Sequence, residues 1–309
     1  MHTILGAGGV IGTELVKELV SRRETIRLVA RNPRASASIV QVVAMDLADL
    51  EQTTSAVSGS SVVYVLVGLK YDVNVWREVW PRIMRNAIEA CKRANAKLIF
   101  FDNVYMYGKV SGPMTEETPF NPSSRKGEIR AQIATMLLDE IKAGSLRALI
   151  ARSADFYGPA ARTSIANILV VDKLARRERA AWLVNDSVPH SFTFTPDAGK
   201  SLAMLAASEG SWNQTWHVPT AAQPPTGREF IRLAATRLGV EPRYRVLSPF
   251  MLKLAGVFNS DVRELGEMLY QYASPYVFDS TKFTKAFSFE ATDYGAGIER
   301  TTSTYQAPQ

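Results

Sequence analysis

Residues 3–12 of the chain read TILGAGGVIG, a short apolar run that passes into a glycine-rich turn and then into a helical pattern. The glycines have GxxGxxG spacing: Gly6 would allow a tight turn, Gly9 a close backbone approach to a phosphate, and Gly12 tight packing of helix on strand. The start of such a helix offers free N–H groups and a positive dipole end to phosphates. This strand–turn–helix context predicts a dinucleotide-binding site. We assign its contacts to Gly6, Gly8, Gly9, Val10, Ile11 and Gly12.

Beyond this turn, short apolar runs alternate with amphipathic stretches. Strands are predicted at residues 3–5, 26–30, 40–44, 62–67, 97–101 and 147–152, and helices at 12–22, 50–57, 76–94, 127–143 and, later, 161–179. This alternation predicts an α/β fold of the Rossmann type, a doubly wound parallel sheet with helices on both faces. We expect a dinucleotide-binding domain at residues 1–155, to which residues 190–220 return, and mainly a smaller C-terminal substrate-binding domain at residues 156–309.

The composition of the 309 residues is that of a globular protein, with 46% hydrophobic and 21% charged residues. No apolar run approaches the roughly 18 residues needed to cross a bilayer, and no signal-peptide pattern precedes the first strand. One cysteine fits a reducing compartment, so we expect a cytoplasmic protein without membrane contact. The net charge of +6 comes without a basic run, which argues against nucleic acid. Three histidines without ligand spacing argue against a metal site.

The residues after the second strand bear on the identity of the dinucleotide. NAD-binding proteins usually place an acidic residue at this strand end, where it holds the ribose 2′-hydroxyl. Here Arg31 and Arg34 follow the strand, and their guanidinium groups could grip a 2′-phosphate. We therefore favour NADP(H) over NAD(H), with solvated arginines as the alternative. After the third strand, Asp46 and Leu47 would lie beside the adenine, although Asp46 could instead cap the helix that begins near residue 50.

With these residues, the chain resembles the extended short-chain dehydrogenase/reductase family, also called the NAD-dependent epimerase/dehydratase family. The resemblance covers nearly the whole chain and rests on the order of several short segments. They are the glycine turn, Asp46-Leu47, and residues 85–91, 104–108, 115–119, 152–159, 192–197, 279–282 and 294–299.

The resemblance implies an enzyme that acts on a hydroxyl or carbonyl of a small molecule, with a cofactor that carries the hydride. In this family a Ser/Thr, a Tyr and a Lys take part in the proton transfer to or from that group. The resemblance also implies that Val67 and Gly68 contact the nicotinamide ribose. The helices predicted at residues 76–94 and 127–143 correspond to the family's dimer surface, so we expect a homodimer or a monomer.

The chain departs from the family at the catalytic positions. Asn103 stands where the hydroxyl residue is expected, four residues before Tyr107. Aligned through Gly127, the family's YxxxK pair is replaced by Lys126 and Arg130. The two cations keep the i, i+4 spacing and would share one helix face near the cofactor. The usual proton donor is therefore missing.

Several interpretations of this departure stay open. Lys126 could act as a general acid if burial and Arg130 lower its pKa, and Arg130 could hydrogen-bond the nicotinamide ribose. Tyr105 could supply a phenol from a neighbouring position. The two cations could also bind an anionic substrate, or be ordinary surface charges. The sequence thus predicts an NADP(H)-dependent oxidoreductase or epimerase/dehydratase-like enzyme with Lys126, Arg130, Asn103 and Tyr105 as catalytic candidates. The alternative is a catalytically inactive NADP(H)-binding sensor or interaction protein.

Overall fold

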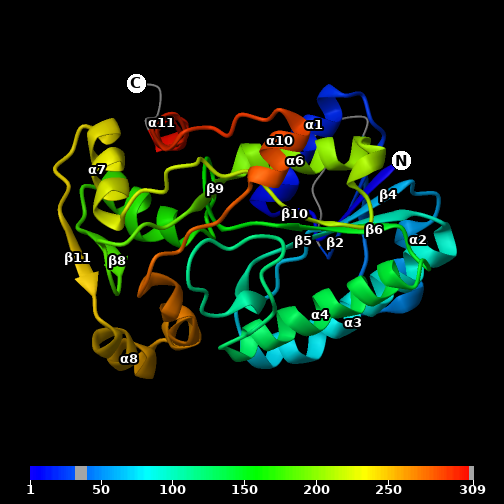
Figure 1. Cartoon of the computed structure of the whole chain (residues 1–309), viewed down its shortest axis with the longest axis horizontal. Coiled ribbons are helices and arrows are strands. Elements are labelled where there is room, and N and C mark those ends of the chain that lie inside the picture. Colours follow the sequence, from blue (N-terminus) through cyan, green and yellow to red (C-terminus); the bar gives the residue numbers. More distant parts are fainter. Residues whose placement is uncertain (32–39, 306–309) are drawn as a thin grey trace.

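The computed structural model describes residues 1–31 and 40–305. At its centre lies a seven-stranded sheet in the order β10-β6-β5-β4-β1-β2-β3, in which every neighbouring pair is parallel (Figure 1). This order confirms the predicted doubly wound Rossmann-type fold. The strands are β1 (His2–Leu5), β2 (Ile26–Ala30), β3 (Val40–Ala44), β4 (Val62–Val65), β5 (Lys97–Asp102), β6 (Ala148–Arg152) and β10 (Thr215–His217).

Helices cover both faces of this sheet (Figure 1). The central strands read as continuous apolar runs because both of their faces are buried; all residues of β4 and β6 are buried. One face packs against α2 (Leu50–Val57), α3 (Val73–Ala94) and α4 (Arg125–Lys142). The other face packs against α1 (Val10–Ser21), α6 (Thr195–Ala207) and α10 (Thr281–Phe287).

A second, smaller lobe lies beyond the carboxyl end of the sheet. Its core is aromatic and includes Tyr157, Phe192, Phe194 and Phe230. Two short parallel pairs build it, β7 (Asp155–Tyr157) with β9 (Phe192–Phe194) and β8 (Ala180–Leu183) with β11 (Tyr244–Leu247). Its helices are η2 (Asn167–Val171, a π-helix), α5 (Asp172–Ala175), α7 (Gly227–Leu238), α8 (Pro249–Phe258), α9 (Ser260–Leu265) and α11 (Tyr294–Thr302).

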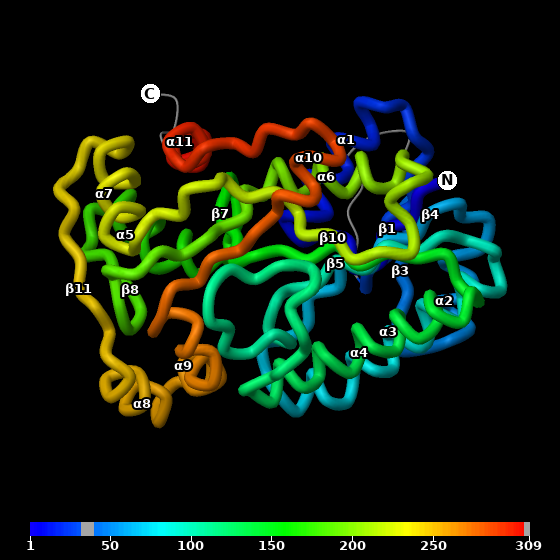
Figure 2. Tube along the Cα trace, in the orientation of Figure 1, coloured from blue at the N-terminus to red at the C-terminus, as the bar shows by residue number. Residues whose placement is uncertain are grey.

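Four short 3-10 helices complete the described elements. They are η1 (Tyr105–Tyr107), η3 (Glu209–Ser211), η4 (Gly266–Tyr272) and η5 (Ser303–Tyr305). The trace in Figure 2 shows that the chain passes from the smaller lobe back to the sheet through α6 and β10, and later through α10. Among the described helices, none has both the length and the hydropathy that crossing a membrane requires.

Candidate cofactor and catalytic site

Gly6 lies where the loops after β1 and β4 cross. Its φ is +88°, and a Cβ atom there would lie 2.5 Å from the Cα atom of Val67. No side chain fits such a crossing, and the left-handed backbone independently favours glycine. Strands β1 and β4 are the neighbours at which the strand order reverses, the position where ligands of doubly wound sheets bind.

The next two glycines, Gly8 and Gly9, have open space beside them at the start of α1. A Cβ atom at Gly8 or Gly9 would meet no described atom within 4 Å. Gly9 is the N-cap of α1, and within the described residues no side chain caps this helix end. The first-turn N–H groups and the positive end of the helix dipole are therefore open to an anion. This arrangement suits a phosphate group.

Gly12 does not have the packing role expected from the sequence. A Cβ atom at Gly12 would lie 3.7 Å from the Leu66 side chain and 4.0 Å from that of Ile4, which are ordinary contacts. The prediction that Gly12 serves the tight packing of this helix on the strand was therefore wrong, because a methyl group would fit there. The tight contact of α1 is with α6 instead, where a Cβ atom at Gly199 would lie 2.6 Å from the carbonyl carbon of Glu14.

The groups expected around the ribose and the adenine lie at the ends of β2 and β3. Arg31 follows β2 and is exposed, whereas Arg34 lies outside the described residues. Asp46 is exposed and its Oδ1 accepts the Ala48 N–H at 3.0 Å. The N-cap of α2 is Asp49, so the alternative that Asp46 caps this helix was wrong. Leu47 is buried.

The other backbone contacts predicted for the cofactor also lie at this edge of the sheet. Val67 and Gly68 follow β4, where Val67 is half-buried and Gly68 is exposed. Val10 and Ile11 open α1 directly after the N-cap Gly9. The sequence-predicted glycine turn and the loop after β4 are therefore brought together by the crossing at Gly6.

Helix α4 brings two of the catalytic candidates to the carboxyl end of β5. Its N-cap Ser124 accepts the Gly127 N–H at 3.0 Å. A Cβ atom at Gly127 would lie 2.6 Å from the carbonyl oxygen of Tyr105, so the helix touches η1 at this glycine. Lys126 and Arg130 lie on either side of that contact and are 0% and 5% exposed. The interpretation of these two residues as ordinary surface charges was therefore wrong.

Lys126 is held by two carboxylates of the smaller lobe. Its Nζ lies 2.5 Å from Glu264 Oε2 and 2.7 Å from Glu267 Oε1, and 3.1 Å from the backbone oxygen of Glu264. It also lies 4.5 Å from the ring centre of Tyr71. An ammonium group has three hydrogens, and all three are used here. Sequence reasoning missed both glutamates, which lie more than 130 residues away along the chain.

Arg130 points to the sheet instead of to the smaller lobe. Its Nε lies 2.7 Å from Asp102 Oδ1, and a second guanidinium nitrogen lies 2.5 Å from the same oxygen. The guanidinium carbon lies 4.6 Å from the ring centre of Trp80. Burial raises the pKa of Asp102, although the positive charges of Arg130 and Arg152 act against this. In this arrangement Arg130 serves a buried ion pair, and Asp102 is a partner that the sequence did not indicate.

Asn103 and Tyr105 lie in the turn that directly follows β5. The Tyr105 hydroxyl lies 3.5 Å from that of Tyr71, and its ring stacks on Trp76 with 6.3 Å between ring centres. Asn103 Oδ1 accepts the Tyr105 N–H at 3.1 Å, so this side chain stabilises the turn. Burial, reinforced by the negative charge of Asp155, raises the pKa of Tyr105.

A second buried group faces the same region from the smaller lobe. His190 is sandwiched between the rings of Tyr272 and Tyr276, with ring centres 4.5 Å and 4.3 Å away. Its Nε2 lies 3.0 Å from Asp155 Oδ2, which also accepts the Tyr272 hydroxyl at 3.0 Å. The Asp155 side chain is 23% exposed. Nothing in the sequence marked Asp155 as a candidate for a functional site.

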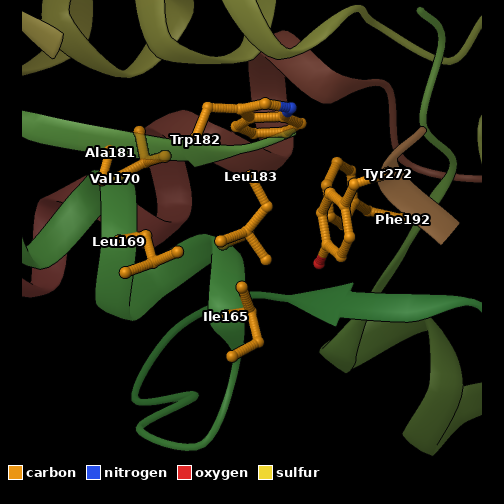
Figure 3. A pocket seen from close by; sticks show the side chains of 9 residues that line it. Ile165, Leu169, Val170, Ala181, Trp182, Leu183, Phe192 and Tyr272 are labelled. Carbon is orange, nitrogen blue, oxygen red and sulfur yellow. The ribbon is translucent and has the colours of Figure 1, made fainter. Parts of the chain in front are cut away.

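The apolar cavity shown in Figure 3 lies inside the smaller lobe, beside Tyr272 and Trp182. Its volume is about 10 Å³, which is barely enough for one water molecule. This cavity therefore has no room for a substrate.

The fold and the open glycine turn are those of a doubly wound Rossmann-type protein. The family model described as "NAD dependent epimerase/dehydratase family" matches residues 2–195. The chain belongs to this family. A search of curated proteins for similar sequences finds no match.

Solved structures of similar fold cover nearly the whole chain. The UDP-glucose 4-epimerase of Thermus thermophilus in complex with NAD has a TM-score of 0.80 and 16% identity, over 99% of each chain. The dTDP-glucose 4,6-dehydratase DesIV of Streptomyces venezuelae, solved with NAD, has a TM-score of 0.81 and 16% identity, over 99% of this chain and 97% of that one. MoeE5 in complex with UDP-glucuronic acid and NAD has a TM-score of 0.79 and 20% identity, over 99% and 98%. At these identities the likeness establishes a common fold.

Proposed function

We propose that the protein is an NADP(H)-dependent oxidoreductase or epimerase/dehydratase-like enzyme that acts on a hydroxyl or carbonyl of a small molecule. The observation that carries this proposal is the open turn at the switch point, where Gly6 is fixed against Val67 and the start of α1 is uncapped among the described residues. A dinucleotide pyrophosphate fits above Gly8 and Gly9. The solved structures described above hold NAD, which supports a nicotinamide cofactor for this chain as well.

The preference for NADP(H) rests on the end of β2. Arg31 is exposed there, and residues 26–31, which read IRLVAR, contain no acidic residue. A carboxylate at that position would repel a 2′-phosphate, whereas a guanidinium group attracts one. The test is a fluorescence titration with NADPH and NADH side by side. Tighter binding of NADPH, weakened by Arg31→Ser, supports the preference, and equal or tighter binding of NADH rejects it.

For the proton transfer we favour Tyr105 over Lys126. The Tyr71 hydroxyl donates to the Tyr105 hydroxyl oxygen, which leaves the Tyr105 hydrogen for a substrate, whereas Lys126 has no hydrogen to spare. When bound, the nicotinamide supplies the hydride. A tyrosine with a raised pKa keeps its proton, so it serves better as an acid toward a developing alkoxide than as a base. We therefore propose carbonyl reduction as the favoured direction.

The experiment for this activity is a screen of carbonyl compounds with NADPH, followed by single variants on the first substrate found. Tyr105→Phe removes only the hydroxyl and should abolish most of the turnover. Tyr244→Phe is the control, because this tyrosine lies on β11 and bonds Asp186 instead. Turnover that survives in Tyr105→Phe at the level of the control rejects the assignment.

The second candidate function is a catalytically inactive NADP(H)-binding sensor. One observation favours it: both cations at the catalytic positions are bound to the protein's own carboxylates, Lys126 to Glu264 and Glu267 and Arg130 to Asp102. Tight NADPH binding with a conformational change and no turnover would support this function. Reduction of any compound in the screen that depends on Tyr105 would exclude it.

For the oligomeric state we favour the monomer. The homodimer would be built from α3 and α4, but within the described chain neither helix carries a large hydrophobic side chain that is exposed. The exposed large hydrophobic side chains gather elsewhere, mainly on α8. Sedimentation of the purified protein distinguishes the two states.

A further inference from the structure

Helix α8 carries an apolar face that points away from the protein. Five large side chains of this helix are exposed, by 75%, 43%, 57%, 68% and 87%: Phe250, Met251, Leu254, Val257 and Phe258. Their i, i+1, i+4, i+7, i+8 spacing places them on one side of the helix.

The opposite side of α8 holds the helix to the protein through its two buried residues, Leu252 and Gly256. A Cβ atom at Gly256 would lie 3.1 Å from the Cα atom of Arg263, so α8 packs closely on α9 there. A helix that is apolar on opposite sides is normally covered on both. We call the outward face of α8, formed by the five exposed residues, the α8 face.

Basic residues occur in the same part of the chain, in which β11, α8 and α9 follow one another (Figure 2). Lys253 is on α8, Arg245 is on β11 and Arg263 is on α9, and Arg243 precedes β11; all four are exposed. Within residues 1–31 and 40–305, none of the four forms an ion pair. The exposed carboxylates of this stretch are Glu241 and Asp261, so positive charge is in excess.

We propose that the α8 face, with the exposed Lys253 on the same helix and the exposed Arg245 on the preceding strand, forms a docking surface for an anionic lipid membrane. A short helix with phenylalanine and leucine on its outer side can lie in the interface, with these side chains at the boundary between headgroups and acyl chains. Arginine and lysine beside it attract anionic headgroups. The sequence-based expectation of no membrane contact rested on the lack of a spanning segment, and binding at the surface does not need one.

A second copy of the chain fits this face less well. In a twofold dimer the same patch lies on both sides of the interface, so the basic residues of one copy would face those of the other. Like charges at short distance oppose such an association. An anionic surface is instead complementary to both the apolar face and its charged surroundings.

The test is co-sedimentation of the full chain with vesicles of phosphatidylcholine, with and without phosphatidylserine, at low and high salt. We expect about tenfold tighter binding to the vesicles with phosphatidylserine, weakened by salt. The double variant Phe250→Ser/Phe258→Ser should lose binding to both kinds of vesicle. Arg245→Glu/Lys253→Glu should lose only the preference for phosphatidylserine. All four positions are exposed, so circular dichroism should show an unchanged fold.

The matched control is Ile168→Ser, which removes an exposed apolar side chain (37%) on another helix. It should bind vesicles like the unmodified protein. Failure of the unmodified protein to bind either vesicle overturns the proposal, as does equal binding to both kinds. A concentration-dependent dimer that disappears in Phe250→Ser/Phe258→Ser would assign the α8 face to a second copy instead.

Discussion

Lys126 of α4 and Glu264 of α9 form a buried ion pair at 2.5 Å, although they lie 138 residues apart in the sequence. Glu267 Oε1 lies 2.7 Å from the same Lys126 Nζ. Burial acts to raise the pKa of Glu264, but hydrogen bonds from Lys126 and from the Val73 backbone outweigh it and lower the pKa. The pair therefore joins the start of α4 on the sheet to the smaller lobe.

Replacing Lys126 by Met should destabilise the fold. The substitution keeps the shape of the side chain but leaves the poorly exposed Glu264 without its counterion, and Glu267 with only the exposed Arg125 at 3.6 Å. Removing one partner of a buried ion pair costs about 3–5 kcal/mol. Urea unfolding measures this as a lower free energy of unfolding. The triple variant Lys126→Met/Glu264→Gln/Glu267→Gln should recover much of the lost free energy of unfolding. A loss below about 1 kcal/mol in Lys126→Met would show that the ion pair contributes little to stability.

Gly6 and Gly12 should respond differently to replacement by alanine. At Gly6 the positive φ and the 2.5 Å approach to Val67 leave no room, so Gly6→Ala should cost at least about 3 kcal/mol. Gly12→Ala should be stabilising by about 0.5–1 kcal/mol, because the methyl group fits and alanine is the better helix former. Thermal unfolding measures both. A stable Gly6→Ala protein would contradict the crossing of the two loops.

Gly9→Ala separates folding from cofactor binding. Gly9 has an ordinary φ of −77° and open space around it, so the variant should fold, at a cost of at most about 1 kcal/mol because alanine is a poorer N-cap than glycine. Its methyl group would stand in the open space proposed for the pyrophosphate, and NADPH binding should weaken by about tenfold or more. The NADPH titration checks this, with Gly210→Ala as the control that should bind normally, because Gly210 is an exposed glycine of η3 with open space around it.

The alternating pattern of the first half predicts the sheet well, because parallel strands buried on both faces read as short apolar runs between helical stretches. The predicted helix over residues 161–179 is shorter in the structure, where the π-helix Asn167–Val171 continues into α5. The i, i+4 spacing of Lys126 and Arg130 predicts a common orientation. Their long side chains diverge instead, one to the smaller lobe and one to the sheet.

The carboxylate partners of both cations could not be found in the sequence. Glu264 and Glu267 look like solvated residues of an irregular helical stretch, and only the folding of the smaller lobe over α4 brings them to Lys126. Asp102 ends a strand whose pattern is apolar, and its role depends on Arg130 from the neighbouring helix. Contacts between distant segments determine such sites, and local periodicity contains no information about them.

His217 should make the protein less stable in acid. Burial lowers its pKa from 6.5 to about 3, and its ring bonds the Tyr107 hydroxyl at 2.8 Å and the Asp279 carbonyl at 2.7 Å. In the unfolded chain His217 therefore binds a proton as the pH falls below 6.5. In the folded chain it stays neutral down to about pH 3. The contribution of His217 to stability is complete above pH 6.5 and falls by about 1.4 kcal/mol per pH unit below it.

Urea unfolding between neutral pH and pH 4 measures this slope, and His217→Gln should reduce it. The ring protons of His217 in an NMR titration should not shift in the same range. A midpoint near 6.5 for His217 would contradict its burial as a neutral ring.

If Tyr105 is the proton donor, the pH profile of carbonyl reduction should show it. An ordinary tyrosine loses its proton near pH 10, but burial and the negative charge of Asp155 raise the pKa of Tyr105 above that. A group with a raised pKa stays protonated below it, so the rate of reduction at saturating NADPH should persist through the range in which an exposed tyrosine ionises. Asp155→Asn removes the neighbouring charge and should shift any alkaline limb to lower pH. An alkaline limb that is unchanged in Asp155→Asn, or a Tyr105→Phe variant with full turnover, would assign the proton to another group.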